Sequence, residues 1–285
     1  MSAPSGSAAP DPAFLASALA AAQRAADAAE AVIVPRWRAQ DFSVVTKADA
    51  TPVTEADREA EAAIKRVLRA AFPQHAFYGE EEGREGDGEF LWLIDPIDGT
   101  KAFVRGYPMF STQIALMHAG ELVLGVSAAP EYGERAWAVR DGGAFLRDAR
   151  GERRIRVAAT HAFDAQAAIS TGNLKSLAAS PARWAAYADL VRRVGRIRGY
   201  GDFLHYHLLA RGAIDLVIES DLNILDIAPL VVLVREAGGT FTDVDGQPIS
   251  LDTRSALAGT PALHAQALAA FNGQVSGEAE AKAKT

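Results

Sequence analysis

The sequence predicts a fold that mixes helices and strands, and two observations support this prediction. Residues 13–38 and 55–72 are rich in Ala and repeat apolar residues at helical spacing. Most of the remaining chain alternates further helical patterns with short apolar runs bounded by Gly, Pro and Asp, as is typical of strands. The chain has 285 residues, 49% of them hydrophobic, so it can bury a large core in one domain or in two lobes.

The first two helices carry their own start and stop signals. The first is expected to end near Pro35, because proline lacks the N–H that a helix interior needs. Thr54 is a good N-cap for the second. Asp57 lies in the first turn of that helix, where complementing the helix dipole is the simplest explanation of its charge.

The later elements follow in order from their patterns. Ala119 and Gly120 form a turn between two strands, and Trp184 and Leu190 are expected to face inward from a helix. Further strands are predicted at 77–78, 91–94, 135–139, 144–146, 153–157, 167–170, 196–200 and 214–219, with strand and turn at 240–250. Further helices are predicted at 181–194, at 202–211 and after Asp226 up to Gly238.

Residues 13–273 are expected to form one domain with two continuous lobes, because no repeat or linker interrupts them. Residues 1–12 are expected to be flexible, and residues 274–285 to be a disordered tail. The first twelve residues lack the basic start and apolar middle of a signal peptide, so we expect a cytoplasmic protein.

Charge and composition exclude several classes of partner. A net charge of -7 and a pI near 5.4 argue against binding to nucleic acid or to an anionic membrane. No apolar run approaches the length of a membrane span. The chain has no cysteine, which excludes disulfides and thiolate metal sites and directs attention to metals that bind oxygen ligands.

The stretch LWLIDPIDGTKAFVRGYP, residues 91–108, is the strongest candidate for a site. Its four apolar residues fit a strand buried on both faces, and Asp95 follows where this run stops. Pro96 is expected to end the pairing of the strand and to favour a turn. A helix is expected to start near Gly99 and Thr100, with N–H groups that suit a phosphate.

Asp95 and Asp98 can face one point, which suits a hard cation. At a separation of ~5 Å and an effective dielectric of ~20, two such charges repel by about 3 kcal/mol, so a cluster of them needs a metal or shifted protonation. The simpler alternative is that Asp95 caps the turn and Asp98 caps the helix. For an isolated motif both explanations remain open.

Two other segments carry acids with similar alternatives. Glu80 lies in a run of three glutamates bracketed by glycines, which is typical of a solvated loop but also permits a metal ligand at the end of a strand. Asp226 precedes an apolar helical pattern, and helix capping explains it on local sequence alone.

Taken together, three motifs resemble those of the inositol monophosphatase family of magnesium-dependent phosphatases. They are G-E-E at 79–81, D-P-I-D-G-T at 95–100 and the D-I-A-P…E-A-G-G block at 226–239, in matching order and spacing. The similarity spans residues 47–246. The resemblance implies a layered αβαβα sandwich of the α/β (α+β) class and a homodimer. It also implies that Glu80, Asp95, Asp98 and Asp226 have a functional role, in place of the simpler local explanations given above.

The resemblance also implies roles for individual residues. Glu80, Asp95, the backbone carbonyl of Ile97, Asp98 and Asp226 would hold two or three Mg²⁺ ions, with Asp95 as the bridge. Asp57, in the family's V-T-x-x-D pattern, would act with Thr100 to position and deprotonate the attacking water. The backbone N–H groups of Gly99 and Thr100 would bind the phosphate of a small substrate.

The substrate is indicated by neighbouring residues. DGTKAFVRGYP and RGYGD are similar to the branch of this family that hydrolyses histidinol phosphate. Asp202 and Glu219 align with family positions that line the pocket for the alcohol half. The resemblance also implies that Ile97, Asp98 and Asp226 contact the substrate. Two acids there would suit an amine or imidazole better than a neutral polyol. Alternatively, Asp202 caps a helix and Glu219 forms a surface ion pair.

We therefore expect a Mg²⁺-dependent phosphomonoesterase acting on L-histidinol phosphate. The same chemistry on inositol 1-phosphate or on another small sugar or nucleotide phosphate is the second hypothesis. A non-catalytic protein that binds a phosphate ligand is the third. Leu225 departs from the family, which usually has tryptophan before the last metal-binding aspartate, and this weakens the substrate assignment by removing a large packing surface.

Overall fold

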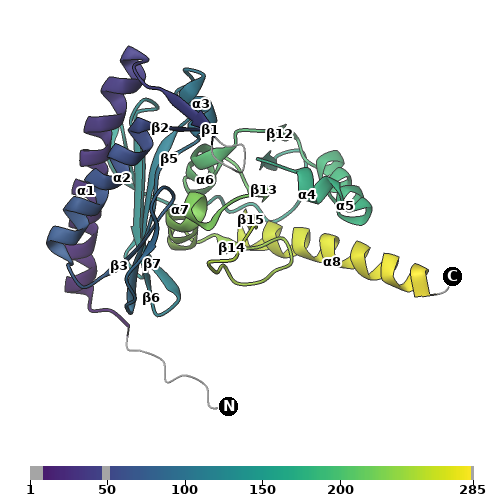
Figure 1. Cartoon of the computed structure of the whole chain (residues 1–285). Helices are drawn as coiled ribbons and strands as arrows, with labels where there is room; N and C mark the ends of the chain where they lie inside the picture. The colour runs from purple at the N-terminus through teal and green to yellow at the C-terminus, as the bar shows by residue number, and fades with distance from the viewer. Residues whose placement is uncertain (1–8, 47–51, 284–285) are drawn as a thin grey trace.

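Five layers of helices and sheets make up the protein, as shown by a computed structural model that describes residues 9–46 and 52–283 (Figure 1). Two long helices cover one face of an eight-stranded sheet, and two further helices separate that sheet from a five-stranded one. The outer face of the smaller sheet is covered by three helices. The αβαβα sandwich is thereby confirmed.

The large sheet is antiparallel except where β3 and β5 pair in parallel. In spatial order it contains β10 (Gly151–Ile155), β9 (Gly143–Asp148), β8 (Glu134–Val139), β7 (Glu121–Ala129), β6 (Ser111–His118), β5 (Phe90–Asp98), β3 (Ala76–Gly79) and β4 (Gly83–Glu85). Its outer face packs against α1 (Pro12–Ala39) and α2 (Glu55–Ala71).

The small sheet mixes parallel and antiparallel pairs. In spatial order it contains β12 (Arg196–Arg198), β11 (Ala168–Thr171), β13 (Leu216–Ser220), β15 (Ser255–Gly259) and β14 (Thr240–Thr242). The helices between the sheets are α6 (Asp202–Ala210) and α7 (Ile224–Glu236), and those outside are α4 (Lys175–Ala178), α5 (Pro181–Arg193) and α8 (Pro261–Ala283). A short pair, β1 (Val44–Thr46) and β2 (Pro52–Thr54), precedes α2, and α3 (Thr100–Val104) follows β5.

Strand β5 explains why a continuous apolar run lies at the centre of the molecule. Leu91 and Leu93 face the core beneath α7, whereas Trp92 and Ile94 face the core beneath α1 and α2. Both faces of the strand are covered by helices, so every position must be apolar. The prediction of a strand buried on both faces is confirmed.

Small side chains allow α1 to lie close to α2 and to the sheet. Its buried stripe consists mostly of alanine, and Leu15 and Ile33 are its larger members. The expectation that the helix ends near Pro35 is wrong, because Pro35 lies inside α1. The helix continues for one more turn, in which Trp37 packs against Phe110, and ends at Ala39.

Several expectations about the small sheet and its helices also need correction. Trp184 was expected to face inward, but it is 43% exposed while Leu190 is buried. The sequence patterns predict no element between residues 251 and 273, but β15 and most of α8 lie there. The structure extends α8 to Ala283, through residues 274–283 that are expected to be disordered, because Ala, Glu and Lys favour a helix. No helix in the described part of the chain is long and apolar enough to cross a membrane.

The contact between β7 and α7 yields a test of the layered packing. Gly125 of β7 lies so close to α7 that a Cβ atom there would be 2.4 Å from the Pro229 carbonyl oxygen. We expect Gly125→Ala to lower the free energy of unfolding by about 1–3 kcal/mol, measured by urea denaturation, because backbone must shift to relieve the clash.

Gly273→Ala is the matched control. An added Cβ there meets no heavy atom within 4 Å, so the stability should be unchanged or slightly higher. A Gly125→Ala protein that unfolds at the wild-type urea concentration would contradict this packing of α7 on the sheet.

Candidate active site

A bulge at the end of β5 brings Asp95 and Asp98 to the same side of the sheet. Three residues apart in a regular strand, they would point to opposite faces. Asp95 pairs with Gln113 and Asp98 with Ser111, so two residues of β5 oppose one residue of β6 between them. The expectation that Pro96 ends the pairing is wrong, because pairing resumes at Asp98 and a bulge tolerates proline.

Asp57 and Asp226 occupy equivalent positions at the starts of two helices. Thr54 caps α2 as predicted, and its N–H donates to Asp57 Oδ2 at 2.8 Å. Asn223 caps α7, and its N–H donates to Asp226 Oδ2 at 2.9 Å. Asp226 is therefore the third residue of the helix (N3), where it closes a capping box, and is not the cap itself. In each box the helix start holds one carboxylate oxygen, and the other remains available to the site.

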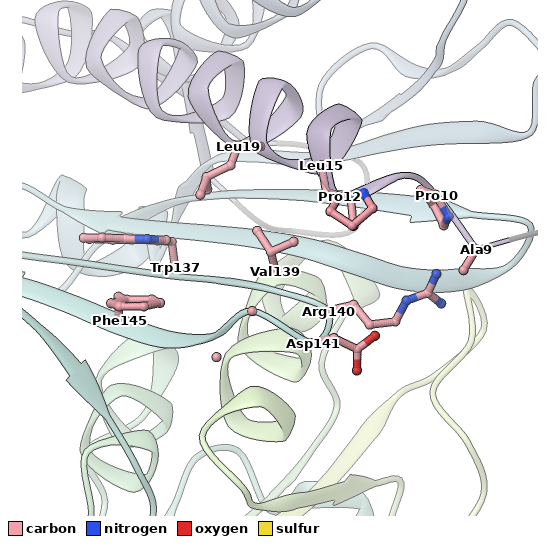
Figure 2. A pocket seen from close by; sticks show the side chains of 13 residues that line it. Ala9, Pro10, Pro12, Leu15, Leu19, Trp137, Val139, Arg140, Asp141 and Phe145 are labelled. Carbon is pink, nitrogen blue, oxygen red and sulfur yellow. The ribbon is translucent and has the colours of Figure 1, made fainter.

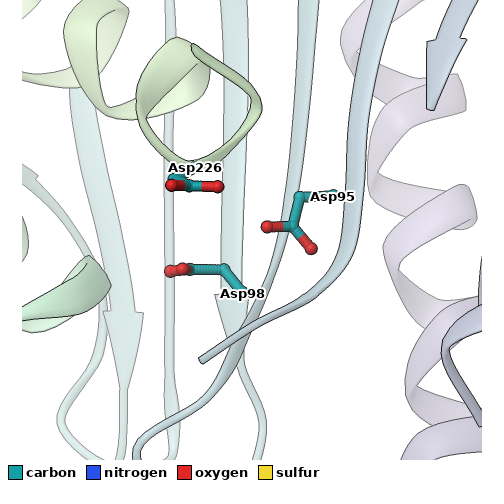
Figure 3. Close-up of side chains that lie close together, drawn as sticks. All are labelled: Asp95, Asp98 and Asp226. Atoms are coloured by element: carbon teal, nitrogen blue, oxygen red, sulfur yellow. The ribbon is translucent and has the colours of Figure 1, made fainter. Parts of the chain in front are cut away.

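Asp95, Asp98 and Asp226 meet in one place. Each offers a carboxylate oxygen, and these three oxygens lie within 4.8 Å of one another. Figure 3 shows Asp226 reaching from the start of α7 toward the two aspartates of β5. The layered fold thus joins two motifs that are far apart in the sequence.

Glu80 follows β3, the parallel neighbour of β5. Its N–H donates to the carbonyl of Ile94 at 3.1 Å, which places it beside Asp95. It lines the same cavity as the three aspartates. Glu80 is partly buried, whereas Glu82, two residues on, is exposed, so the prediction of a solvated loop fits only the far end of this glutamate run.

Burial and mutual repulsion raise the pKa values of the carboxyl groups in this cluster. Burial, with the charges of Glu80, Asp98 and Asp226, raises the pKa of Asp95 well above its ordinary value. Burial and nearby acids, including Asp226, do the same to the pKa of Asp98. Burial raises the pKa of Asp226 to about 7. At neutral pH these carboxylates can be ionised together only with positive charge among them.

This donor set fits a hard divalent cation. All its donors are oxygens, and they come from side chains that are buried or partly buried. Part of each carboxylate is already fixed: Asp95 Oδ1 accepts the Ile97 N–H at 3.0 Å, and Asp98 Oδ2 accepts the Ser111 hydroxyl at 3.2 Å. Such second contacts hold a ligand in position for a metal.

Thr100 connects the bulge to Asp57. Its hydroxyl lies 3.0 Å from the Ile97 carbonyl oxygen and 3.5 Å from Asp57 Oδ1. Gly99, with φ at 87°, makes the turn between β5 and α3, and a Cβ there would lie 2.6 Å from the Met109 carbonyl oxygen. Burial raises the pKa of Asp57 to about 6, against the hydrogen bonds from Thr54.

A cavity of about 450 Å³ opens beside the cluster. Acids dominate its lining, and two cations face them from α3 and the residue after it, Lys101 and Arg105. Predicted site residues that line it are Glu80, Asp95, Ile97, Asp98, Gly99, Thr100, Asp202, Glu219 and Asp226. Asn173 and Asp221 also line the cavity, although no local pattern in the sequence marks either residue as part of a site.

Glu219 lies at the side of the cavity formed by the small sheet. The Tyr206 hydroxyl donates to Glu219 Oε2 at 2.9 Å, and His205 Nε2 lies 3.2 Å from the same oxygen. The Asn173 N–H donates to Oε1 at 3.4 Å. Burial alone would raise the pKa of Glu219, but His205 and Tyr206 outweigh it, so the pKa lies below its ordinary value. Glu219 is a fixed negative charge, not a surface ion pair.

Asp202 faces the same space from the first residue of α6. Gly201 is the residue before the helix, and no side chain caps it, so the alternative explanation of Asp202 as a cap does not hold. Burial and the charge of Glu219 raise the pKa of Asp202. Leu222 lines the cavity, whereas Leu225, which departs from the family pattern, is buried in the core around α7.

A second cavity, of about 350 Å³, lies away from the acidic cluster at the start of α1 (Figure 2). Leu15 and Leu19 face Trp137 and Phe145 across it. Its lining has one carboxylate, Asp141, so it lacks the donor set of the first cavity.

Comparison with known proteins agrees with this geometry. A sequence model described as the inositol monophosphatase family matches residues 15–276. The histidinol-phosphatase of Streptomyces coelicolor is 43% identical over 228 residues, which cover 78% of this chain and 85% of that protein. The inositol-1-monophosphatase of Rhizobium meliloti is 37% identical over 224 residues, covering 77% of this chain and 82% of that protein.

The fold comparison gives the same result. The crystal structure of extragenic suppressor protein suhB from Bartonella henselae matches with a TM-score of 0.78 and 31% identity, and covers 91% of this chain and 98% of that chain. An inositol monophosphatase from Anabaena matches with a TM-score of 0.77 and 29% identity, over 90% and 96% of the two chains. With the family match over most of the sequence, these similarities show that the chain belongs to the inositol monophosphatase family.

Proposed function

We propose that the protein is a Mg²⁺-dependent phosphomonoesterase that hydrolyses L-histidinol phosphate to L-histidinol and phosphate, a step of histidine biosynthesis. The observation that carries the proposal is one cavity with two different kinds of negative site. Asp95, Asp98 and Asp226 form a cluster that fits divalent cations, and Glu219 forms a separate fixed charge for the alcohol half of the substrate.

The carboxylate cluster suits two or three Mg²⁺ ions held by Glu80, Asp95, the Ile97 carbonyl, Asp98 and Asp226. When bound, Mg²⁺ supplies positive charge that acidifies the attacking water and stabilises the phosphate and leaving oxygens. The residues themselves contribute fixed orientation, because hydrogen bonds to Asp95, Asp98 and Asp226 hold one oxygen of each. This preorganisation is the main source of rate enhancement in such a site.

Asp57 and Thr100 supply proton transfer in this proposal. Thr100 takes a proton from the attacking water and passes its own hydroxyl proton to Asp57 Oδ1, 3.5 Å away. With a pKa of about 6, Asp57 is ionised at neutral pH and remains basic enough to accept this proton. Gly99 and Thr100 at the start of α3 position the phosphate.

The substrate assignment rests on charge. Histidinol carries an ammonium group, and a desolvated ammonium needs an anionic partner. Glu219 provides one that is held in place by Tyr206, His205 and the Asn173 N–H. Asp202 adds a second carboxylate on the same side of the cavity. The curated relatives at 43% and 39% identity, both named histidinol-phosphatase, support the same assignment.

Hydrolysis of inositol 1-phosphate is the second candidate. The inositol-1-monophosphatase of Rhizobium meliloti is 37% identical to this chain, compared with 43% for the histidinol-phosphatase of Streptomyces coelicolor. A non-catalytic phosphate-binding role is disfavoured, since the chain retains every candidate carboxylate ligand. The proposal also includes the homodimer implied by the family resemblance and the cytoplasmic location expected from the sequence.

Phosphate release from a substrate panel in saturating Mg²⁺ tests the function directly. We expect L-histidinol phosphate to be the best substrate, and Asp98→Asn to lower its turnover by about 10³-fold or more with native circular dichroism. The substitution removes charge at constant size from a cluster that repels itself without metal.

Asp148→Asn, which removes a partly buried carboxylate that pairs with Arg150 and Arg153 and does not line the cavity, is the matched control and should retain activity. Negligible turnover of histidinol phosphate beside good turnover of inositol 1-phosphate would reverse the order of the two substrates. An active Asp98→Asn enzyme would contradict the metal-based mechanism.

Glu219→Gln tests the recognition of a cation. We expect the KM for histidinol phosphate to rise by about tenfold or more, because a charge-assisted hydrogen bond is lost from a buried site. The KM for inositol 1-phosphate, which has no cation, serves as the internal control and should change much less. Equal changes for both substrates would remove the support for a cationic ligand.

The raised pKa values predict how Mg²⁺ stabilises the protein. A carboxyl group whose pKa is raised in the folded state stabilises the fold fully at pH values below its unfolded pKa. This stabilisation is lost as the pH rises through the folded pKa, which is about 6 for Asp57 and about 7 for Asp226. Protons compete with the cation at the low end of this range. We therefore expect Mg²⁺ to raise the Tm more at about pH 7.5 than at about pH 5.

Scanning calorimetry with and without Mg²⁺ measures this difference, with NaCl at equal ionic strength as the control. An equal rise in Tm at both pH values would mean that these carboxylates do not bind the ion.

A further inference from the structure

A fully buried glutamate of α2, Glu61, lies directly behind the loop that carries Glu80. Its side chain is 0% exposed. Glu61 Oε2 accepts the N–H of Glu81 at 2.8 Å, and Oε1 accepts the N–H of Glu82 at 3.1 Å. Lys65, one turn along α2 and also buried, places Nζ 2.7 Å from Glu61 Oε1. An ionised carboxylate buried in this way is expensive unless it is paired and hydrogen-bonded, and here it is both.

The backbone leaves room for this carboxylate only because residue 79 is glycine. A Cβ atom on Gly79 would lie 2.1 Å from Glu61 Oε1 and 2.4 Å from its Cδ. Gly79 ends β3, and its φ does not require glycine. The missing side chain therefore serves to admit the Glu61 carboxylate.

Glu80 is held between two anchors. On one side its own N–H donates to Ile94 in β5 at 3.1 Å. On the other side the next two N–H groups donate to Glu61. Lys65 adds a third link, because Nζ lies 2.8 Å from Glu82 Oε2 at the exposed end of the loop. The backbone of Glu80 is thus fixed from α2 and from β5, the strand that carries Asp95.

We propose that Glu61, neutralised by Lys65, is a positioning residue that presets the Glu80 loop for cation binding. The inference rests on the proposed role of Glu80 as a metal ligand. Glu61 touches neither substrate nor cation, and acts only through the backbone of residues 81 and 82. Hydrogen bonds behind a first ligand typically alter metal affinity by about 10- to 100-fold.

Glu61→Gln keeps the size of the side chain but replaces one acceptor oxygen with an NH₂ donor and removes the charge that pairs with Lys65. We expect Mg²⁺ affinity, measured by isothermal titration calorimetry without substrate, to fall by about tenfold or more. The Mg²⁺ concentration for half-maximal activity should rise by a similar factor, while kcat at saturating Mg²⁺ stays within a few-fold of wild type.

Gly79→Ala provides a second variant that keeps every charge. Its added Cβ displaces the Glu61 carboxylate, so the same loss of Mg²⁺ affinity is expected. Glu59→Gln is the matched control, because Glu59 lies on the same helix and pairs with Arg36 at the surface. Wild-type Mg²⁺ affinity in folded Glu61→Gln and Gly79→Ala would overturn the proposal. A lower Tm with unchanged affinity would do the same, since it would show a purely structural role.

Hydrogen exchange of the wild-type protein tests the proposal even if both variants fail to fold. Because Glu61 holds the loop before the ion arrives, the N–H groups of Glu81 and Glu82 should be protected without Mg²⁺ and should gain little on its addition. Exchange at unprotected rates until Mg²⁺ is added would show that the ion orders the loop, and would overturn the proposal.

The two proposals fail in different ways. If wild-type protein binds Mg²⁺ but releases no phosphate from any substrate, the enzyme assignment fails and the role of Glu61 remains testable. If phosphate is released with normal Mg²⁺ dependence in the Glu61 and Gly79 variants, only the positioning role fails.

Discussion

The structure depends on holding several carboxylates together against their mutual repulsion. Asp95, Asp98 and Asp226 lie within reach of one ion, and burial raises the pKa of each. Such a cluster is unfavourable in a folded chain without positive charge. The fold tolerates it because the surrounding sheets and helices bury large apolar surfaces on both sides of β5. The same repulsion would favour the binding of a divalent cation at this cluster.

Each carboxylate is held by a device at the end of a regular element. A bulge directs Asp95 and Asp98 to one side of β5, and capping boxes fix Asp57 and Asp226 at two helix starts. Glu80 is held through its backbone, with Glu61 behind it. Strand ends and helix starts combine a rigid position with backbone groups that need partners, so they can orient a charged side chain accurately.

The electrostatics differ at the side of the cavity formed by the small sheet. There the fold lowers the pKa of one carboxylate, Glu219, by placing His205 and Tyr206 of α6 against it. In the proposed function, the Glu219 carboxylate would bind the alcohol half of the substrate and the acidic cluster with its cations would bind the phosphate half.

The sequence by itself determined most elements, and its motifs identified Asp95, Asp98 and Asp226, the acids that the fold brings together. The apolar run of β5 identified a strand buried on both faces, and Thr54 marked the start of α2. Local patterns could not choose between helix capping and metal binding for Asp226, because its position serves the first and is compatible with the second. Oδ2 accepts the Asn223 N–H in the capping box, and a carboxylate oxygen of Asp226 lies near those of Asp95 and Asp98. Glu61 gave no signal at all, since a glutamate four residues before a lysine on a helix is typical of a solvated surface pair. Glu61 is buried only because α2 packs behind β3 and the loop that carries Glu80. This packing depends on contacts between segments distant in the sequence, which local periodicity does not reveal.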